Sequence, residues 1–261
     1  MNLTQLLEAI TYSENSATVE VTEDWLQGRS MFGGLQAALG VRAMRQAIPE
    51  DLPLKTLQTT FISPVPSGKV TATASILRTG KNATHVEARI VDGEQTLALF
   101  VGVFGRSRDS AIGREIPQPI IDNPTNTLFE FLKGVTPNFT QHFTAKWLKG
   151  GLPFTSSQLP ESVTEISINE DALTSESHFL AIADFIPPVA LSLLTVPSAG
   201  SSLTWMLEFL CDDYQRQPLQ KWRVDAEMTA ASGGYTSQTA TIYAPDGSAV
   251  ALSRQSMVIF G

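Results

Sequence analysis

The stretch that decides the fold is residues 78–105, RTGKNATHVEARIVDGEQTLALFVGVFG. Residues 231–261 repeat its plan as ASGGYTSQTATIYAPDGSAVALSRQSMVIFG. Each copy has a Gly-containing turn, an alternating run, an Asp-Gly pair and a second run that ends in Phe-Gly. An Asp-Gly pair between two alternating runs is one of the strongest short-range signals of a β-hairpin. We therefore predict two related hairpins, with turns at residues 92–93 and 246–247.

The similarity continues upstream of both hairpins. Residues 31–47, MFGGLQAALGVRAMRQA, have helical periodicity and precede an expected strand over residues 54–65. In the second half we expect a helix over residues 184–194, DFIPPVALSLL, and a strand over residues 201–210. Each half thus predicts one central helix followed by long antiparallel strands. This pattern indicates a duplicated domain of roughly 100 residues.

These elements divide the chain into an expected N-terminal domain (residues 1–106), a linker (107–160) and a C-terminal domain (161–261). The linker is rich in Pro, Asn, Thr and Gly, and one short helix is expected at residues 127–135. The fold class is α+β, with two antiparallel sheets that each wrap a helix and lie side by side. Because an unpaired sheet edge needs a partner, the two sheets can join into one. The seam between them is the expected place for a ligand cleft.

The composition argues against several classes of protein. Among 261 residues, 18 are Lys or Arg and 26 are Asp or Glu, which gives a net charge of −8 with no basic run. This charge argues against nucleic acid as a partner and against stable association with anionic membranes. One cysteine and three scattered histidines predict neither a disulfide framework nor a metal site. Without a long apolar run or a basic leader, we expect a cytoplasmic protein.

One carboxylate interrupts an otherwise apolar run. Residues 180–194, LAIADFIPPVALSLL, contain Asp184 as their single charged residue. Burying an unpaired carboxylate costs several kcal/mol, so Asp184 needs a partner, solvent or a chemical role. It is either the N-cap of a helix that starts near Pro187 and Pro188, or a functional carboxylate beside a ligand channel.

Comparing the two copies with each other locates further polar residues. At three places the second copy has a polar group where the first has an apolar one. The aligned pairs are Asp184 with Met31, Ser202 with Leu54, and Gln255 with Leu99. An acid, a hydroxyl and a carboxamide can together hold a water and activate it, with the acid as general base. The alternative for each residue is structural: a helix cap for the acid, and ordinary strand positions for the other two.

Four segments carry a resemblance to a known family. They are GRSMFGGLQAALG (residues 28–40), AIADFIPPVAL (181–191), SSLTWMLEF (201–209) and ALSRQSMV (251–258). Through them the halves resemble hotdog domains, and nearly the whole chain resembles the double-hotdog acyl-CoA thioesterase II family and its thioesterase-like relatives. The first segment departs from the family's Phe-Gly-Gly-Gln pattern, because Leu35 lies between the glycines and Gln36.

The resemblance implies an α+β double hotdog that hydrolyses an acyl-CoA thioester to the free acid and CoA. In this family an aspartate, a threonine and a glutamine hold the attacking water. Asp184 matches the aspartate at the head of the second helix, and Gln255 matches the glutamine. Ser202 falls at the threonine position and keeps the hydroxyl without the methyl group. Thr204, two residues on and expected on the same strand face, is the fallback.

Backbone N–H groups at the start of the first helix are the expected oxyanion donors. In hotdog enzymes such groups polarise the thioester carbonyl, and Gly33 and Gly34 occupy this position here. The alternative is that both glycines only allow a tight loop. The resemblance implies no metal or cofactor, and the expected partner is acyl-CoA. It leaves open whether the chain forms a homo-oligomer.

The sequence leaves two other functions beside hydrolysis. A double hotdog that binds acyl-CoA or acyl-carrier protein without turnover is the main alternative, because the serine departs from the family's threonine. A hotdog dehydratase or hydratase is less expected, because it needs a histidine paired with an acid at the head of a central helix. None of His85, His142 and His178 lies at such a place in the sequence.

Overall fold

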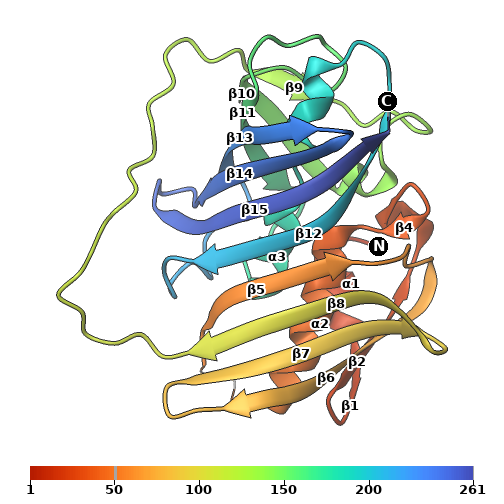
Figure 1. Cartoon of the computed structure of the whole chain (residues 1–261), viewed down its shortest axis with the longest axis vertical. Helices are drawn as coiled ribbons and strands as arrows, with labels where there is room; N and C mark the ends of the chain where they lie inside the picture. The colour runs from red at the N-terminus through yellow and green to blue at the C-terminus, as the bar shows by residue number, and fades with distance from the viewer. Residues whose placement is uncertain (50–51, 261) are drawn as a thin grey trace.

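The computed structural model describes residues 1–49 and 52–260, and within these residues thirteen strands form one antiparallel sheet (Figure 1). The first half contains α1 (Leu3–Glu8), β1 (Thr11–Ser13), β2 (Ser16–Val21), η1 (Glu23–Trp25), β3 (Leu26–Gln27), β4 (Ser30–Met31), α2 (Gly33–Ala47), β5 (Leu54–Phe61), β6 (Gly68–Thr79), β7 (Ala83–Asp92) and β8 (Gln95–Gly105). The second half contains β9 (Thr127–Phe129), η2 (Asn138–His142), β10 (Phe143–Lys149), β11 (Glu161–Ile168), α3 (Glu176–Ala183), η3 (Val189–Leu193), β12 (Ala199–Phe209), β13 (Trp222–Ser232), β14 (Tyr235–Tyr243) and β15 (Ala249–Phe260).

The strand order repeats about the centre of the sheet. Its full order is β1-β2-β6-β7-β8-β5-β12-β15-β14-β13-β11-β10-β9. From the central pair of strands outward, the first half continues from β5 to β8 and β7, and the second half continues from β12 to β15 and β14. β5 and β12 pair directly across the seam, with Leu57 opposite Leu207. The two half-sheets predicted to lie side by side are joined into a single sheet. They join because pairing their edge strands satisfies the backbone groups of both edges.

Both predicted hairpins and the first central helix are confirmed. β7 pairs with β8 and β14 with β15, and the turn glycines Gly93 and Gly247 have φ of 57° and 89°. These left-handed angles suit glycine, which explains the Asp-Gly signal. The helix α2 covers one face of the first half-sheet and ends before Pro49, as expected from the restriction that proline places on the preceding residue.

The central helix of the second half lies earlier than predicted. Residues 176–183 form α3, and Ser175 caps its start by accepting from the backbone N–H of His178. Asp184 is the C-cap of α3, so both its placement at a helix head and the N-cap interpretation are wrong. The tandem prolines at 187–188 end the α-helical region and precede only the short 3-10 turn η3.

The segment between the hairpin of the first half and β11 contains a second difference. Residues 127–135, predicted as a helix, form β9 and a turn, and β9 pairs with β10 at the sheet edge. Figure 1 shows residues 106–126 as a long connection running beside the sheet from β8 toward β9. The domain boundaries at 106 and 160 stay predictions. In the described ranges, no helix has the length and apolarity needed to cross a membrane.

The facing of side chains corrects the alignment between the halves. Gln255 and Phe100 both point to the buried face, whereas Leu99 is partly exposed, so Gln255 corresponds to Phe100. Ser202 pairs with Met257 of β15, and the residue of β8 that corresponds to Met257 is Gly102, which pairs with Leu57. Ser202 therefore corresponds to Leu57. At both positions the second half still has a polar residue where the first half has an apolar one, although the aligned residues of the first half differ from those predicted.

Candidate active site

The Asp184 carboxylate lies where the two halves meet. Its Oδ1 accepts a hydrogen bond from Nε2 of Gln255 at 2.7 Å, and the backbone N–H of Gly34 also donates to the carboxylate. Its Oδ2 lies above Gly33, so close that an added Cβ there would be 2.6 Å away. Asp184 comes from the end of α3, Gln255 from β15, and both glycines from the start of α2. The site therefore combines both halves of the chain.

The environment of Asp184 suits a base that works near neutral pH. Burial raises the pKa of Asp184 to about 7, although the hydrogen bonds from Gln255 and Gly34 act in the opposite direction. A carboxylate with this pKa is substantially ionised at pH 7 and can still accept a proton efficiently. The bond from Gly34 also places the negative charge at the start of α2, where the helix dipole favours it.

Gln255 is held by a second buried amide. Its Oε1 accepts from Nε2 of Gln238 at 3.3 Å, and Oε1 of Gln238 accepts from the backbone N–H of Val189 at 2.9 Å. Gln238 is only 3% exposed and lies opposite Gln255 in the β14–β15 ladder. The sequence interpretation missed Gln238. The signal that finds it is the register of the predicted hairpin, once the irregularity near its turn is known.

A β-bulge separates the two candidate hydroxyls. Between Ser202 and Thr204 the pairing of β12 with β15 skips Leu203. Ser202 therefore lies opposite the buried Met257 on the inner face, whereas Thr204 is exposed opposite Thr60 on the outer face. The expectation that both hydroxyls share one face is wrong, because a bulge interrupts the alternation of a strand.

Ser202 lies on the inner face without contacting the carboxylate. It is partly exposed, and across the described residues its hydroxyl makes no hydrogen bond with Asp184 or Gln255. Directly opposed residues of an antiparallel pair point the same way, so Ser202 projects to the same side of the sheet as Gln255. Its predicted role in holding a water stays a prediction.

The two glycines of α2 have different reasons for lacking a side chain. At Gly34 an added Cβ would lie 2.9 Å from both the Cα of Ala181 and the carbonyl oxygen of Leu180, so this glycine allows α2 and α3 to touch. Its backbone N–H also faces the Asp184 carboxylate. At Gly33 the space is occupied by Asp184 and the ring of Phe61. The role of Gly33 and Gly34 as oxyanion donors stays a prediction.

Two of the three histidines, His178 and His142, have structural partners, whereas the buried Nδ1 of His85 has no hydrogen-bond partner among the described residues. His178 is 5% exposed, and its ring contacts the hydroxyls of Ser175 at 2.7 Å and Thr4 at 3.1 Å. Burial lowers the pKa of His178 to about 4, so its ring is uncharged at neutral pH. His142 contacts Asp24 at 3.0 Å. His178 lies in the first turn of α3, so the expectation that no histidine stands at the head of a central helix is wrong. Among the described residues its ring contacts two hydroxyls and no acid, which gives no support to a dehydratase.

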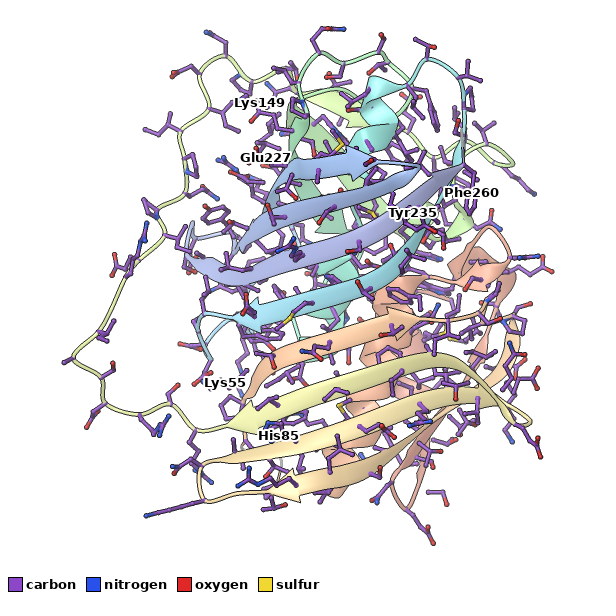
Figure 2. All side chains as sticks on the ribbon, in the orientation of Figure 1. Lys55, His85, Lys149, Glu227, Tyr235 and Phe260 are labelled. Carbon is purple, nitrogen blue, oxygen red and sulfur yellow. The ribbon has the colours of Figure 1, made fainter. Side chains whose placement is uncertain are left out.

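An open groove of about 740 Å³ lies elsewhere, between residues 119–125 and strands β10, β11 and β13. Figure 2 shows two of its lining residues, Lys149 and Glu227, close together at that side of the sheet. Four of its charged side chains form two ion pairs, Lys149 with Glu161 at 2.8 Å and Arg223 with Asp225 at 2.6 Å. Because both of its cations are already paired and Asp184 is not among its lining residues, the groove is not the candidate site.

Comparisons with solved structures show the fold. A conserved protein of unknown function with a hot dog fold from Alicyclobacillus acidocaldarius is 20% identical, with a TM-score of 0.87, and the match covers 100% of this chain and 99% of that one. The tesB protein of Mycobacterium avium subsp. paratuberculosis is 12% identical, with a TM-score of 0.78 and full coverage of both chains. An acyl-CoA thioesterase II from Mycobacterium marinum is 12% identical, with a TM-score of 0.74 and coverage of 97% and 96%.

Family models identify the relationship by sequence. No curated protein matches the chain. The model of the acyl-CoA thioesterase N-terminal domain matches residues 21–105, and the model of the C-terminal domain matches residues 118–259. The C-terminal model alone spans more than half of the sequence, and the two matches follow each other in the family's order. The chain therefore belongs to the acyl-CoA thioesterase family.

Proposed function

We propose that this protein hydrolyses an acyl-CoA thioester to the free acid and CoA. The observation that carries the proposal is the Asp184 carboxylate, held by Gln255 at 2.7 Å over the start of α2. We infer further that the two halves are two hotdog units that share this one site. The family membership and the hotdog fold of the solved relatives support both inferences.

In the proposed mechanism Asp184 acts as general base on a water molecule. The carboxylate takes one proton from the water while the oxygen attacks the thioester carbonyl carbon. Gln255 keeps a second amide hydrogen that can orient the water, and Ser202 supplies a hydroxyl from the inner face of β12. The carbonyl oxygen becomes an oxyanion near the N–H of Gly33. The intermediate then expels the CoA thiolate, which takes the proton held by Asp184, so that CoA and the free acid are formed and the carboxylate is regenerated.

A thiol-release assay over acyl-CoAs from acetyl to palmitoyl tests this proposal. We expect release that depends on chain length, and a loss of about 100-fold or more in Asp184→Asn, since a general base contributes about that much. Ser202→Ala and Thr204→Val form a matched pair, because both remove a β12 hydroxyl but only Ser202 faces the buried side. Wild-type release that survives in Asp184→Asn would place the base elsewhere.

The non-catalytic alternative rests on one observation. Across the described chain the Ser202 hydroxyl has no bond to Asp184 or Gln255, which is an arrangement that binding alone permits. Acyl-CoA binding by calorimetry, combined with no thiol release in the wild type, would support a protein that binds acyl-CoA or acyl-carrier protein. Chain-length-dependent release would exclude it.

A further inference from the structure

We propose that Gln238 is a positioning residue that fixes which end of the Gln255 carboxamide meets Asp184. The inference rests on the proposed hydrolysis for its consequence, but its geometry is independent of the substrate. β14 and β15 are neighbouring strands (Figure 1), and Gln238 and Gln255 are directly opposed residues on them. Their side chains are 3% and 4% exposed, so water does not compete strongly for their amide groups.

The orientation of the chain of amides begins at a backbone donor. The N–H of Val189 can only donate, so Gln238 must present Oε1 to it, at 2.9 Å. The Nε2 of Gln238 then faces Gln255 and donates to its Oε1. This leaves Nε2 of Gln255 for Asp184. The backbone N–H of Val189 thereby determines, through Gln238 and Gln255, that a hydrogen-bond donor faces the Asp184 carboxylate.

A donor at this place favours the ionised form of Asp184. Among the described residues, the pKa of Asp184 responds to burial, to Gln255 on β15 and to the Gly34 N–H on α2, with no charged side chain contributing. The Gln255 amide is therefore the one side-chain contact that can alter the balance. If Gln255 were free to rotate, its Oε1 could accept the proton of a protonated Asp184 and stabilise the inactive form.

Two substitutions separate this role from simple packing. Gln238→Leu removes the constraint without adding charge, so Gln255 can rotate whenever Asp184 is protonated. Gln238→Glu keeps the acceptor for Val189 but offers a second acceptor to Gln255, which enforces the reversed orientation. The matched control is Thr236→Val, because Thr236 lies two residues away on the same face, is 8% exposed and has a hydroxyl without a partner among the described residues.

The test is the pH profile of kcat/KM for thiol release in these variants. In Gln238→Leu we expect the acid limb to move to higher pH, with the rate at pH 6 falling about 2- to 10-fold relative to the rate at pH 8.5, as one rearranged hydrogen bond allows. In Gln238→Glu we expect the plateau itself to fall with KM little changed. Thr236→Val should keep the wild-type profile. An unshifted acid limb in Gln238→Leu and an unchanged plateau in Gln238→Glu would overturn the proposal.

A second readout keeps the inference separate from the proposed function. ¹³C NMR titration of the Asp184 carboxyl carbon reports its protonation whether or not acyl-CoA is turned over. A higher midpoint in Gln238→Leu, with a wild-type midpoint in Thr236→Val, supports the positioning role even if thiol release is absent. Equal midpoints in all three proteins refute it, even if hydrolysis by Asp184 is established.

Discussion

The raised pKa of Asp184 predicts that this carboxylate weakens the fold as pH rises. Its ordinary pKa is 3.8 and its pKa in the folded protein is about 7. Between these values the unfolded chain has released the proton while the folded chain still holds it. The unfolded state then binds fewer protons, so the free energy of unfolding falls as pH rises from about 4 to 7. Replacing Asp184 by Asn removes this dependence.

The structure sets the size of the effect. From pH 4.5 to the folded pKa is about 2.5 pH units, and at 1.36 kcal/mol per unit this gives about 3 kcal/mol. The residue as a whole keeps some solvent contact although its carboxylate is enclosed by Gly33, Gly34 and Gln255. Remaining water stabilises the ionised form, so 3 kcal/mol is an upper bound and about 1–3 kcal/mol is expected.

The assay is urea unfolding of the wild type and Asp184→Asn at pH 4.5 and pH 8. Asn presents an amide hydrogen where the carboxylate accepted one, and this cost is the same at both pH values. This cost therefore cancels when the stability difference between the two proteins at pH 4.5 is subtracted from that at pH 8. Relative to the wild type, the free energy of unfolding of Asp184→Asn should be about 1–3 kcal/mol higher at pH 8 than at pH 4.5.

Asp246→Asn is the control for this measurement. Hydrogen bonds from Ser248 lower the pKa of Asp246, so its contribution to stability is present above pH 3.8 and is lost only as pH falls further. The difference between this variant and the wild type should be constant from pH 4.5 to 8. Parallel pH dependences of the wild type and Asp184→Asn would refute the reasoning.

Three further predictions concern single contacts. Gly33→Ala should lower thiol release more than about tenfold, because the new Cβ would displace the Asp184 carboxylate; Gly113→Ala, in open space, is its control. Arg45→Met should destabilise the fold by about 3 kcal/mol in urea unfolding, since it leaves Glu176 without the two bonds of 2.6 and 2.9 Å that join α2 to α3; adding Glu176→Leu should restore part of the loss. The His178 ring should stay uncharged at pH 5.5 by NMR, and its contribution to stability should be lost as pH falls from about 6.5 toward 4.

Each of these predictions has an outcome that contradicts it. Equal activity in Gly33→Ala and Gly113→Ala would show that Asp184 tolerates displacement. An Arg45→Met protein as stable as the wild type would show that the pair with Glu176 is balanced by its desolvation. A His178 midpoint near 6.5 would show that the ring is not buried as the structure has it.

The sequence by itself determined the elements whose signals are local. The Asp-Gly turns, the alternating runs beside them and the periodicity of α2 each depend on residues within a few positions of one another. They were sufficient to predict two related halves, and the internal comparison was sufficient to single out Asp184 and Gln255. These two residues do meet, at 2.7 Å.

Only the tertiary structure decided how these residues are used. The bulge that turns Thr204 outward reflects the pairing of β12 with strands on both sides, which no local pattern of β12 encodes. The end of α3 at Asp184 places the carboxylate over a helix start about 150 residues earlier, so the donor from Gly34 was invisible in the sequence. Gln238 likewise became a partner of Gln255 through the register of two strands. Side-chain facing and long-range contacts follow from the pairing of the whole sheet, because one shift in register reverses the face of every residue beyond it.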